Sequence, residues 1–210
     1  MKVKICGITR EEDAHAAVAC GAAYVGFIFH AASPRYVTPE RARQIVKTLP
    51  SNVEPVGVFV DADALEVRRV VDLVGLSVAQ LHGDETPEHC QASNGRVWKA
   101  LRVSQASATE RAEWLLASAA YSGCEAMLLD AKADNGHGGT GKTSDWHLAA
   151  SLARTRPVVL AGGLSAANVV DAVKAVTPWA LDVSSGVEDA PGRKSEEKMR
   201  AFFAALRSMR

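Results

Sequence analysis

Two side chains suited to proton transfer stand at the ends of apolar runs. Cys6 closes the run Val3–Cys6, and Asp130 closes the run Ala126–Asp130. A thiolate accepts a proton and a carboxylic acid donates one, so this pair at one mouth would supply a base and an acid. Burying an ionised carboxylate is costly, so Asp130 must reach water, a ligand or a charged partner. The plainer alternatives are a core thiol and a capping or ion-paired carboxylate.

The residues around these two refine the interpretation. Lys4 lies two positions before Cys6, and the two-residue period of a strand puts both on one face. We hypothesise that the Lys4 ammonium favours the Cys6 thiolate. Cys20, Cys90 and Cys124 form no CxxC pair and are predicted to be core residues. The six histidines have no metal-ligand spacing, so no metal is expected.

Two turns in the last third of the chain could bind an anion. A double glycine follows the run Val158–Ala161, and a Ser-Ser-Gly sequence follows Ala180–Val183. Glycines let backbone N–H groups approach an anion, and helix N-termini add partial positive charge. These turns predict a phosphate site, with a tight turn and a plain helix cap as the alternatives. The candidates are Gly162, Gly163, Ser184, Ser185 and Gly186.

Two further polar residues follow other strand candidates. Arg35 lies in Ser33-Pro34-Arg35-Tyr36, and its planar fork suits a carboxylate or phosphate. A salt bridge at the rim explains Arg35 equally well. His82, beside Gly83, either contacts substrate or caps a turn.

A nucleotide-binding pattern occurs once and is misleading. Residues 136–143, GHGGTGKT, match the GxxxxGK[ST] pattern of a P-loop. A true P-loop joins a strand directly to a helix, whereas five residues intervene after Asp130 and five strand candidates come earlier. A glycine-rich loop that closes over a ligand is favoured, and a P-loop nucleotide-binding protein is the disfavoured alternative.

The scaffold must bring several strand ends together. Short apolar runs alternate with amphipathic segments, which predicts parallel strands covered on both faces by helices. The strand candidates are Val3–Cys6, Tyr24–Phe29, Pro55–Val60, Val78–Leu81, Val97–Leu101, Ala126–Asp130, Val158–Ala161 and Ala180–Val183. The helix candidates include Glu11–Cys20, Pro39–Thr48, Ala64–Val74, Ala108–Ala119, Ala166–Val176 and Ser195–Arg207.

Eight such units in 210 residues fit a compact eight-fold barrel, although an open doubly wound sheet has the same local pattern. With no linker-like segment, we expect one catalytic domain over residues 1–210. The strand ends would then share one rim, the active-site face of a barrel.

Composition excludes several classes of protein. The 24 Lys and Arg residues balance 24 Asp and Glu residues without a basic cluster, so a nucleic-acid partner is not expected. No long apolar stretch or leader-like segment is present, which predicts a cytoplasmic protein away from membranes. The predicted partner is a small molecule. The oligomeric state is not readable, and a monomer is slightly preferred.

Ordered motifs along nearly the whole chain resemble one family. From Lys4 to about Lys194 the chain is similar to the phosphoribosylanthranilate isomerases of tryptophan biosynthesis. The resemblance rests on KICGIT at 4–9, GFIF at 26–29, SPRY at 33–36, VGVFV at 56–60, QLHGDE at 80–85, LLD at 128–130, GGTGKT at 138–143, DW at 145–146, AGGL at 161–164, DVSSGVE at 182–188 and PG at 191–192. The resemblance implies a single (βα)8 TIM barrel that needs neither cofactor nor metal.

The resemblance also implies a reaction and residue roles. The family performs an Amadori rearrangement of N-(5-phosphoribosyl)anthranilate to 1-(o-carboxyphenylamino)-1-deoxyribulose 5-phosphate. Asp130 corresponds to the general acid that opens the ribose ring, and Cys6 to the general base that removes the C2′ proton. Arg35 corresponds to the residue facing the anthranilate. The remaining substrate-binding positions implied are His82, Gly139, Gly162, Gly163, Asp182, Ser184, Ser185 and Gly186, with the phosphate on the last loops and Asp182 near the ribose hydroxyls.

Two alternatives on a barrel scaffold stay open at this point. A non-catalytic sugar-phosphate binding barrel would bind the substrate without turnover. The related isomerase of histidine biosynthesis uses a carboxylate pair, and Cys6 in place of one carboxylate argues against it.

Overall fold

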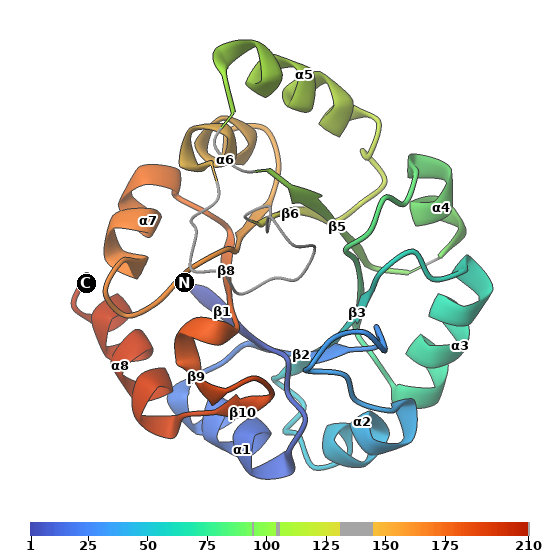
Figure 1. Ribbon diagram of the computed structural model, residues 1–210, viewed down its shortest axis with the longest axis vertical. Helices are drawn as coiled ribbons and strands as arrows, with labels where there is room; N and C mark the ends of the chain where they lie inside the picture. The colour runs from blue at the N-terminus through green and yellow to red at the C-terminus, as the bar shows by residue number, and fades with distance from the viewer. Residues whose placement is uncertain (94, 104–105, 131–144, 210) are drawn as a thin grey trace.

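The computed structural model describes residues 1–93, 95–103, 106–130 and 145–209. Eight parallel strands form a closed barrel in the order β1 to β8, with β8 pairing back onto β1. Figure 1 looks down this ring and shows the helices around its outside. The strands are β1 Lys2–Cys6, β2 Tyr24–Ile28, β3 Glu54–Phe59, β4 Val78–Leu81, β5 Val97–Arg102, β6 Ala126–Asp130, β7 Val158–Leu160 and β8 Ala180–Val183.

Helices connect successive strands, as right-handed βα crossovers require. Their bounds are α1 Glu11–Cys20, α2 Pro39–Val46, α3 Ala64–Val74, α4 Pro87–Ala92, α5 Ala108–Ala119, α6 Trp146–Ala153, α7 Val169–Val176 and α8 Glu196–Arg207. After β8, a 3-10 turn over Ser185–Val187 leads into a small hairpin, β9 Glu188–Ala190 and β10 Arg193–Lys194. None of the described helices is both long and apolar enough to cross a membrane.

The two faces of each strand serve different purposes. Val3 and Ile5 of β1 point outward and pack in the core under the helices. The alternate positions point into the barrel, where small and aromatic residues form a second core. Its buried members are Tyr24, Val56, Val78, Trp98, Ala100, Ala126, Leu128, Val159, Ala161 and Ala180. The inward positions above them, toward the strands' carboxyl ends, carry the polar side chains.

The closed barrel confirms the predicted fold and rules out the open sheet. Most predicted elements occur within one or two residues of their expected ends. Helix α7 begins at Val169 instead of Ala166, after Asn168, whose side chain binds the backbone of Gly163 and Ser165 in the turn.

Helix α6 and the β9–β10 hairpin were not among the predicted elements, and α4 was indicated only at its start, by the capping sequence Thr86-Pro87. For α4 the capping signal was already visible, since Thr86 accepts a hydrogen bond from the His89 N–H and Pro87 occupies the first turn. The helix is only six residues long, which leaves little room for an apolar period.

Candidate active site

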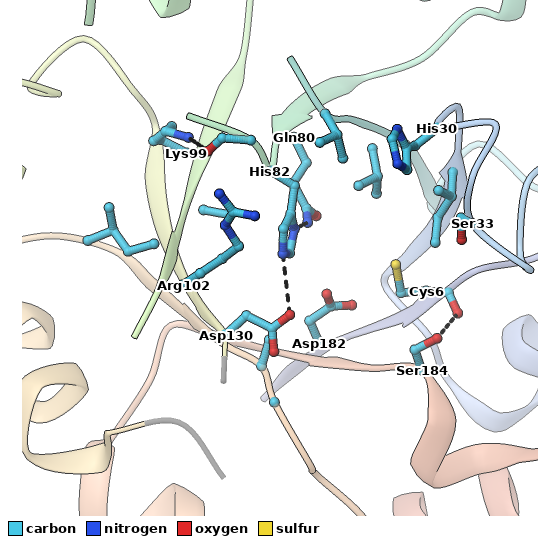
Figure 2. A pocket seen from close by; sticks show the side chains of 18 of the residues that line it. Cys6, His30, Ser33, Gln80, His82, Lys99, Arg102, Asp130, Asp182 and Ser184 are labelled. Carbon is cyan, nitrogen blue, oxygen red and sulfur yellow. Dashed lines mark hydrogen bonds and ion pairs between the residues drawn. The ribbon is translucent and has the colours of Figure 1, made fainter. Parts of the chain in front are cut away.

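A pocket opens at the carboxyl ends of the strands, where the predicted residues meet. It is lined by Cys6, Arg35, His82, Asp130, Gly162, Gly163, Asp182, Ser184 and Ser185, together with residues that were not predicted, including Gln80 and Arg102. In Figure 2 Asp182 lies between Cys6 and Asp130. The chemistry proposed for strands β1 and β6 thus faces one cavity.

Cys6 stands beside a buried cation. A Cβ added to Gly26 on the neighbouring strand would lie 3.1 Å from both Cys6 Sγ and Lys4 Nζ, so the two side chains share the space that Gly26 leaves open. Lys4 is fully buried and donates to both carboxylate oxygens of Asp182 at 3.1 Å. Register explains this contact, because Lys4 and Asp182 are direct partners between β1 and β8.

Opposing charges act on the Cys6 thiol. Burial raises the pKa of Cys6 above its ordinary value, and the Asp182 carboxylate raises it further. The Lys4 and Lys194 ammonium groups pull that pKa down without cancelling the rise. The effect hypothesised for Lys4 therefore has the expected sign, but the thiol is harder to ionise than a free cysteine.

The Lys4–Asp182 pair is itself shaped by burial. Burial alone would lower the pKa of Lys4, yet the nearby charges of Asp182 and Cys6 leave it raised. Burial also keeps the pKa of the Asp182 carboxyl above its ordinary value, since the Lys4 charge offsets only part of the desolvation. Lys4 is thus held as a cation, buried among Gln80, Asp182 and Cys6.

Asp130 faces a chain of side chains from β4. His82 Nε2 lies 3.3 Å from Asp130 Oδ2, which Figure 2 shows as a dashed line. On its other side, His82 Nδ1 lies 2.8 Å from Gln80 Nε2. The carbonyl oxygen of Gln80 in turn accepts from Lys4 Nζ at 2.8 Å. A continuous set of contacts therefore connects the surroundings of Cys6 with Asp130.

Arg35 is held by a carboxylate from the far end of the chain. Its Nε and Nη2 atoms donate to Glu188 at 2.7–3.1 Å, and Glu188 also accepts from Lys194 Nζ at 2.6 Å. The bond to Glu188 helps raise the pKa of Arg35. The salt bridge considered for Arg35 is thus present, and the opposite edge of the guanidinium fork remains turned away from Glu188.

The predicted anion loops also lie at this rim. Gly162 and Gly163 have φ angles of 84° and 65°, a left-handed conformation that glycine adopts without strain. The next loop packs directly against this turn, because a Cβ on Gly186 would fall 1.9 Å from the Leu164 carbonyl oxygen. Ser184 donates to the Cys6 carbonyl at 3.1 Å, which ties the loop after β8 to β1. Gly139 and the GHGGTGKT segment lie outside the described residues.

Sequence reasoning missed Gln80, Glu188 and Lys194. A signal existed for Gln80, an amide within an apolar strand two residues before His82 and hence on the same face. For Glu188 the signal was weaker, because its contact with Arg35 joins residues 153 positions apart.

Fold and site together define a class. A closed (βα)8 barrel with a thiol and a carboxyl lining one pocket at the carboxyl ends of its strands has the arrangement of a barrel enzyme, and these two groups are chemically able to exchange protons. A family model for N-(5'phosphoribosyl)anthranilate (PRA) isomerase matches residues 3–205. The chain therefore belongs to the N-(5'-phosphoribosyl)anthranilate isomerase family, and it is an enzyme.

Individual relatives agree with this assignment. The N-(5'-phosphoribosyl)anthranilate isomerase of Pelobacter propionicus is 45% identical over 100% of this chain and 97% of its own length. The crystal structure of phosphoribosyl anthranilate isomerase from Thermus thermophilus matches with a TM-score of 0.87 and 44% identity, covering 100% of both chains. A phosphoribosyl anthranilate isomerase in complex with reduced 1-(o-carboxyphenylamino)-1-deoxyribulose 5-phosphate matches with a TM-score of 0.84 and 37% identity, covering 99% of both chains.

These findings decide between the alternatives. The P-loop interpretation is wrong, because the strand before GHGGTGKT is the sixth of a closed barrel and the family is that of an isomerase. Membership in a family of enzymes likewise removes the non-catalytic binding barrel.

Proposed function

We propose that this protein catalyses the Amadori rearrangement of N-(5-phosphoribosyl)anthranilate to 1-(o-carboxyphenylamino)-1-deoxyribulose 5-phosphate in tryptophan biosynthesis, with Asp130 as the acid and Cys6 as the base. The observation that carries this proposal is the convergence of Cys6 and Asp130 on one pocket from β1 and β6. Residues 1–210 act as one catalytic domain. Cytoplasmic location and a monomeric state remain predictions.

Asp130 begins the reaction. Its carboxyl group donates a proton to the ribose ring oxygen, the C1′–O bond breaks, and the substrate opens to a Schiff base. The His82 contact at 3.3 Å supports this role, because a fixed carboxyl presents its proton in one direction.

Cys6 completes the proton transfers. Its thiolate removes the C2′ proton, and the electron pair moves into a C1′–C2′ double bond to give an enolamine. The enolamine then becomes the ketone by gaining a proton at C1′ and losing the C2′ hydroxyl proton. Lys4 supports the thiolate from beside Cys6, and Asp182 is placed between acid and base, where the ribose hydroxyls would lie.

The two ends of the substrate match two parts of the rim. The phosphate would bind the backbone of Gly162, Gly163, Ser184 and Ser185, which line the pocket, and of Gly186, the next residue along the chain, which is not among the lining residues. The anthranilate carboxylate would bind the edge of Arg35 that faces away from Glu188. Holding both ends orients the sugar carbons between acid and base.

The test is turnover of freshly generated phosphoribosylanthranilate by the purified, reduced protein, followed by the loss of substrate fluorescence. We expect turnover that persists with EDTA. A folded protein that binds the reduced product analogue but leaves the substrate unchanged would contradict the proposed function.

A further inference from the structure

Gln80 is a buried amide whose two ends have different neighbours. It lies in the middle of β4, faces the barrel interior and is only 1% exposed. One end meets Lys4 Nζ at 2.8 Å and the other meets His82 Nδ1 at 2.8 Å. A polar side chain so deeply buried needs both of these partners.

The chemistry of the two partners fixes the direction of the hydrogen bonds that connect Lys4, Gln80 and His82. An ammonium group only donates, so the end of Gln80 facing Lys4 is the carbonyl oxygen. The amide nitrogen, which also only donates, therefore faces His82 Nδ1, and Nδ1 must accept. The ring proton then resides on Nε2, the atom 3.3 Å from Asp130 Oδ2.

We propose that Gln80, oriented by the buried Lys4–Asp182 pair, is a positioning residue that holds His82 as a neutral imidazole protonated on Nε2. In this form the Nε2–H of His82 is on the side of Asp130, with Nε2 3.3 Å from Oδ2. Gln80 lines the pocket, and the role argued for it is exerted through its contact with His82. The consequence for catalysis rests on the function proposed above.

The neutral ring of His82, protonated on Nε2, is suited to a position beside Asp130 acting as an acid. A neutral imidazole with its proton on Nε2 can donate to the Asp130 carboxylate that forms after proton transfer, which stabilises that carboxylate. An imidazolium would carry a proton on both ring nitrogens. Such a cation would also turn an Nδ1–H against the Gln80 N–H, which the 2.8 Å separation disfavours.

The charged groups around His82 do not determine which of its ring nitrogens carries the proton. The charged groups that line the pocket with His82 are Arg35, Asp84, Glu85, Lys99, Arg102, Asp130 and Asp182, and Lys4 lies behind Gln80. In Figure 2 Arg102 and Asp130 lie on the rim beside His82. None of them contacts Nδ1, which lies against Gln80. The amide therefore decides which ring nitrogen carries the proton.

The direct test is nitrogen-15 NMR of the His82 ring in the unliganded protein near neutral pH, with the signals assigned by a His82→Gln variant. We expect a protonated Nε2 and an unprotonated Nδ1. In Gln80→Glu, one carboxylate oxygen keeps Lys4 and the other accepts from Nδ1, so Nδ1 should become protonated. In Gln80→Met the donor is gone, and both neutral forms should appear.

Steady-state kinetics provide a second test of the role of Gln80. Gln80→Glu should lower kcat about 10- to 100-fold with little change in KM, and Gln80→Met should fall between it and the wild type. The same substitutions at the exposed Gln91 of α4 are the matched controls and should change neither constant.

The outcomes separate this proposal from the proposed function. A wild-type ring protonated on Nδ1, or an unchanged ring pattern in Gln80→Glu, would overturn the role of Gln80. The expected ring pattern in a protein that never turns over phosphoribosylanthranilate would support Gln80 and remove the proposed function. If Gln80→Glu does not fold, the wild-type spectrum and Gln80→Met still decide.

Discussion

At the scale of single residues, the site balances charges around a buried thiol. Cys6 stands between an ammonium group that favours its ionisation and a carboxylate that opposes it. A base must be ionised in part to act, yet a thiolate that is too stable is a weaker base. The Lys4–Asp182 pair therefore controls how readily Cys6 ionises. Substituting each member of the pair in turn separates the two effects.

We predict that Lys4→Met and Asp182→Asn move the ionisation of Cys6 in opposite directions. Losing the Lys4 charge raises the pKa of Cys6 further, and losing the Asp182 charge lowers it. The pH dependence of Cys6 alkylation by iodoacetamide measures this, because only the thiolate reacts. An alkylation midpoint that does not move in Lys4→Met would show that the hypothesis about Lys4 is wrong.

A second prediction concerns Arg35. Arg35→Ala should weaken substrate binding by about 1.5–3 kcal/mol, because a charged hydrogen bond is lost. Steady-state kinetics should therefore show KM raised about tenfold or more with kcat little changed. Arg43→Ala, at an exposed position of α2, is the control. A large fall in kcat with unchanged KM would place Arg35 in the chemical step instead.

Residue types and strand ends were enough to find part of the site. Cys6, Asp130 and Arg35 carry chemistry that is conspicuous after an apolar run, and all three line the pocket. The partner of Arg35 was out of reach, because Glu188 approaches it only once the chain has closed on itself. Gln80 was hidden for a different reason, since an amide gains its role only from the direction of its two hydrogen bonds.

At the scale of elements, the pairing of neighbouring strands makes room for the reacting groups. Cys6 pairs with Gly26 across β1 and β2, and Gly26 has no side chain to occupy the pocket. Periodicity predicted the strands well because their inward and outward residues alternate. It could not predict which neighbour must be small, because that depends on register.

Gly26→Ala should therefore disturb the site more than the fold. The new Cβ would come within 2.8 Å of Lys4 Cε and 3.1 Å of Cys6 Sγ, so both side chains must shift. A displacement of about 1 Å can cost around 100-fold in rate, and the smaller shifts required here should lower kcat/KM by about 10-fold. Gly123→Ala is the matched control, since its Cβ meets only Gln91 Cγ at an ordinary 3.7 Å.

Circular dichroism decides how the Gly26→Ala result is interpreted. An unchanged spectrum together with the loss of activity supports displacement within the site. Wild-type kcat/KM in a folded Gly26→Ala protein would show that the positions of Lys4 and Cys6 tolerate the added methyl group.

At the scale of the whole molecule, buried ion pairs make stability depend on pH. Lys99 donates to Glu85 at 2.7 Å, and both side chains are almost completely buried. Burial alone would raise the pKa of Glu85, but the bonds from Lys99 and the backbone leave it lowered. A lowered folded-state pKa gives stability that is present above the unfolded pKa and lost as pH falls through the folded one.

Lys99→Met should thus reduce the free energy of unfolding by about 3–5 kcal/mol at neutral pH, because Glu85 is left buried and unpaired. Urea denaturation measures this, and the deficit should shrink below about pH 4, where the Glu85 carboxyl is protonated even in the unfolded chain. The control is Arg200→Met, which breaks an exposed pair with Glu196 and should have little effect. A deficit that is independent of pH would mean that packing, and not charge, explains the loss.

The fold as a whole was predictable because every βα unit repeats the same pattern, and the number of units favoured a closed barrel. Periodicity alone left an open sheet as an alternative. The pairing of β1 with β8 settles this and brings Lys4 beside Asp182. The hairpin that carries Glu188 and Lys194 escaped prediction because its strands are only three and two residues long.

The most direct test of the proposed acid and base uses the variants Cys6→Ala and Asp130→Asn. It compares their turnover of phosphoribosylanthranilate with their binding of reduced 1-(o-carboxyphenylamino)-1-deoxyribulose 5-phosphate. Cys20→Ala and Asp72→Asn, on α1 and α3, are the matched controls. We predict that each site variant loses about 10²- to 10⁴-fold in kcat while the analogue still binds, since the proposed function assigns both residues to proton transfer. A folded Cys6→Ala or Asp130→Asn protein with nearly wild-type kcat would contradict the proton-transfer role proposed for that residue.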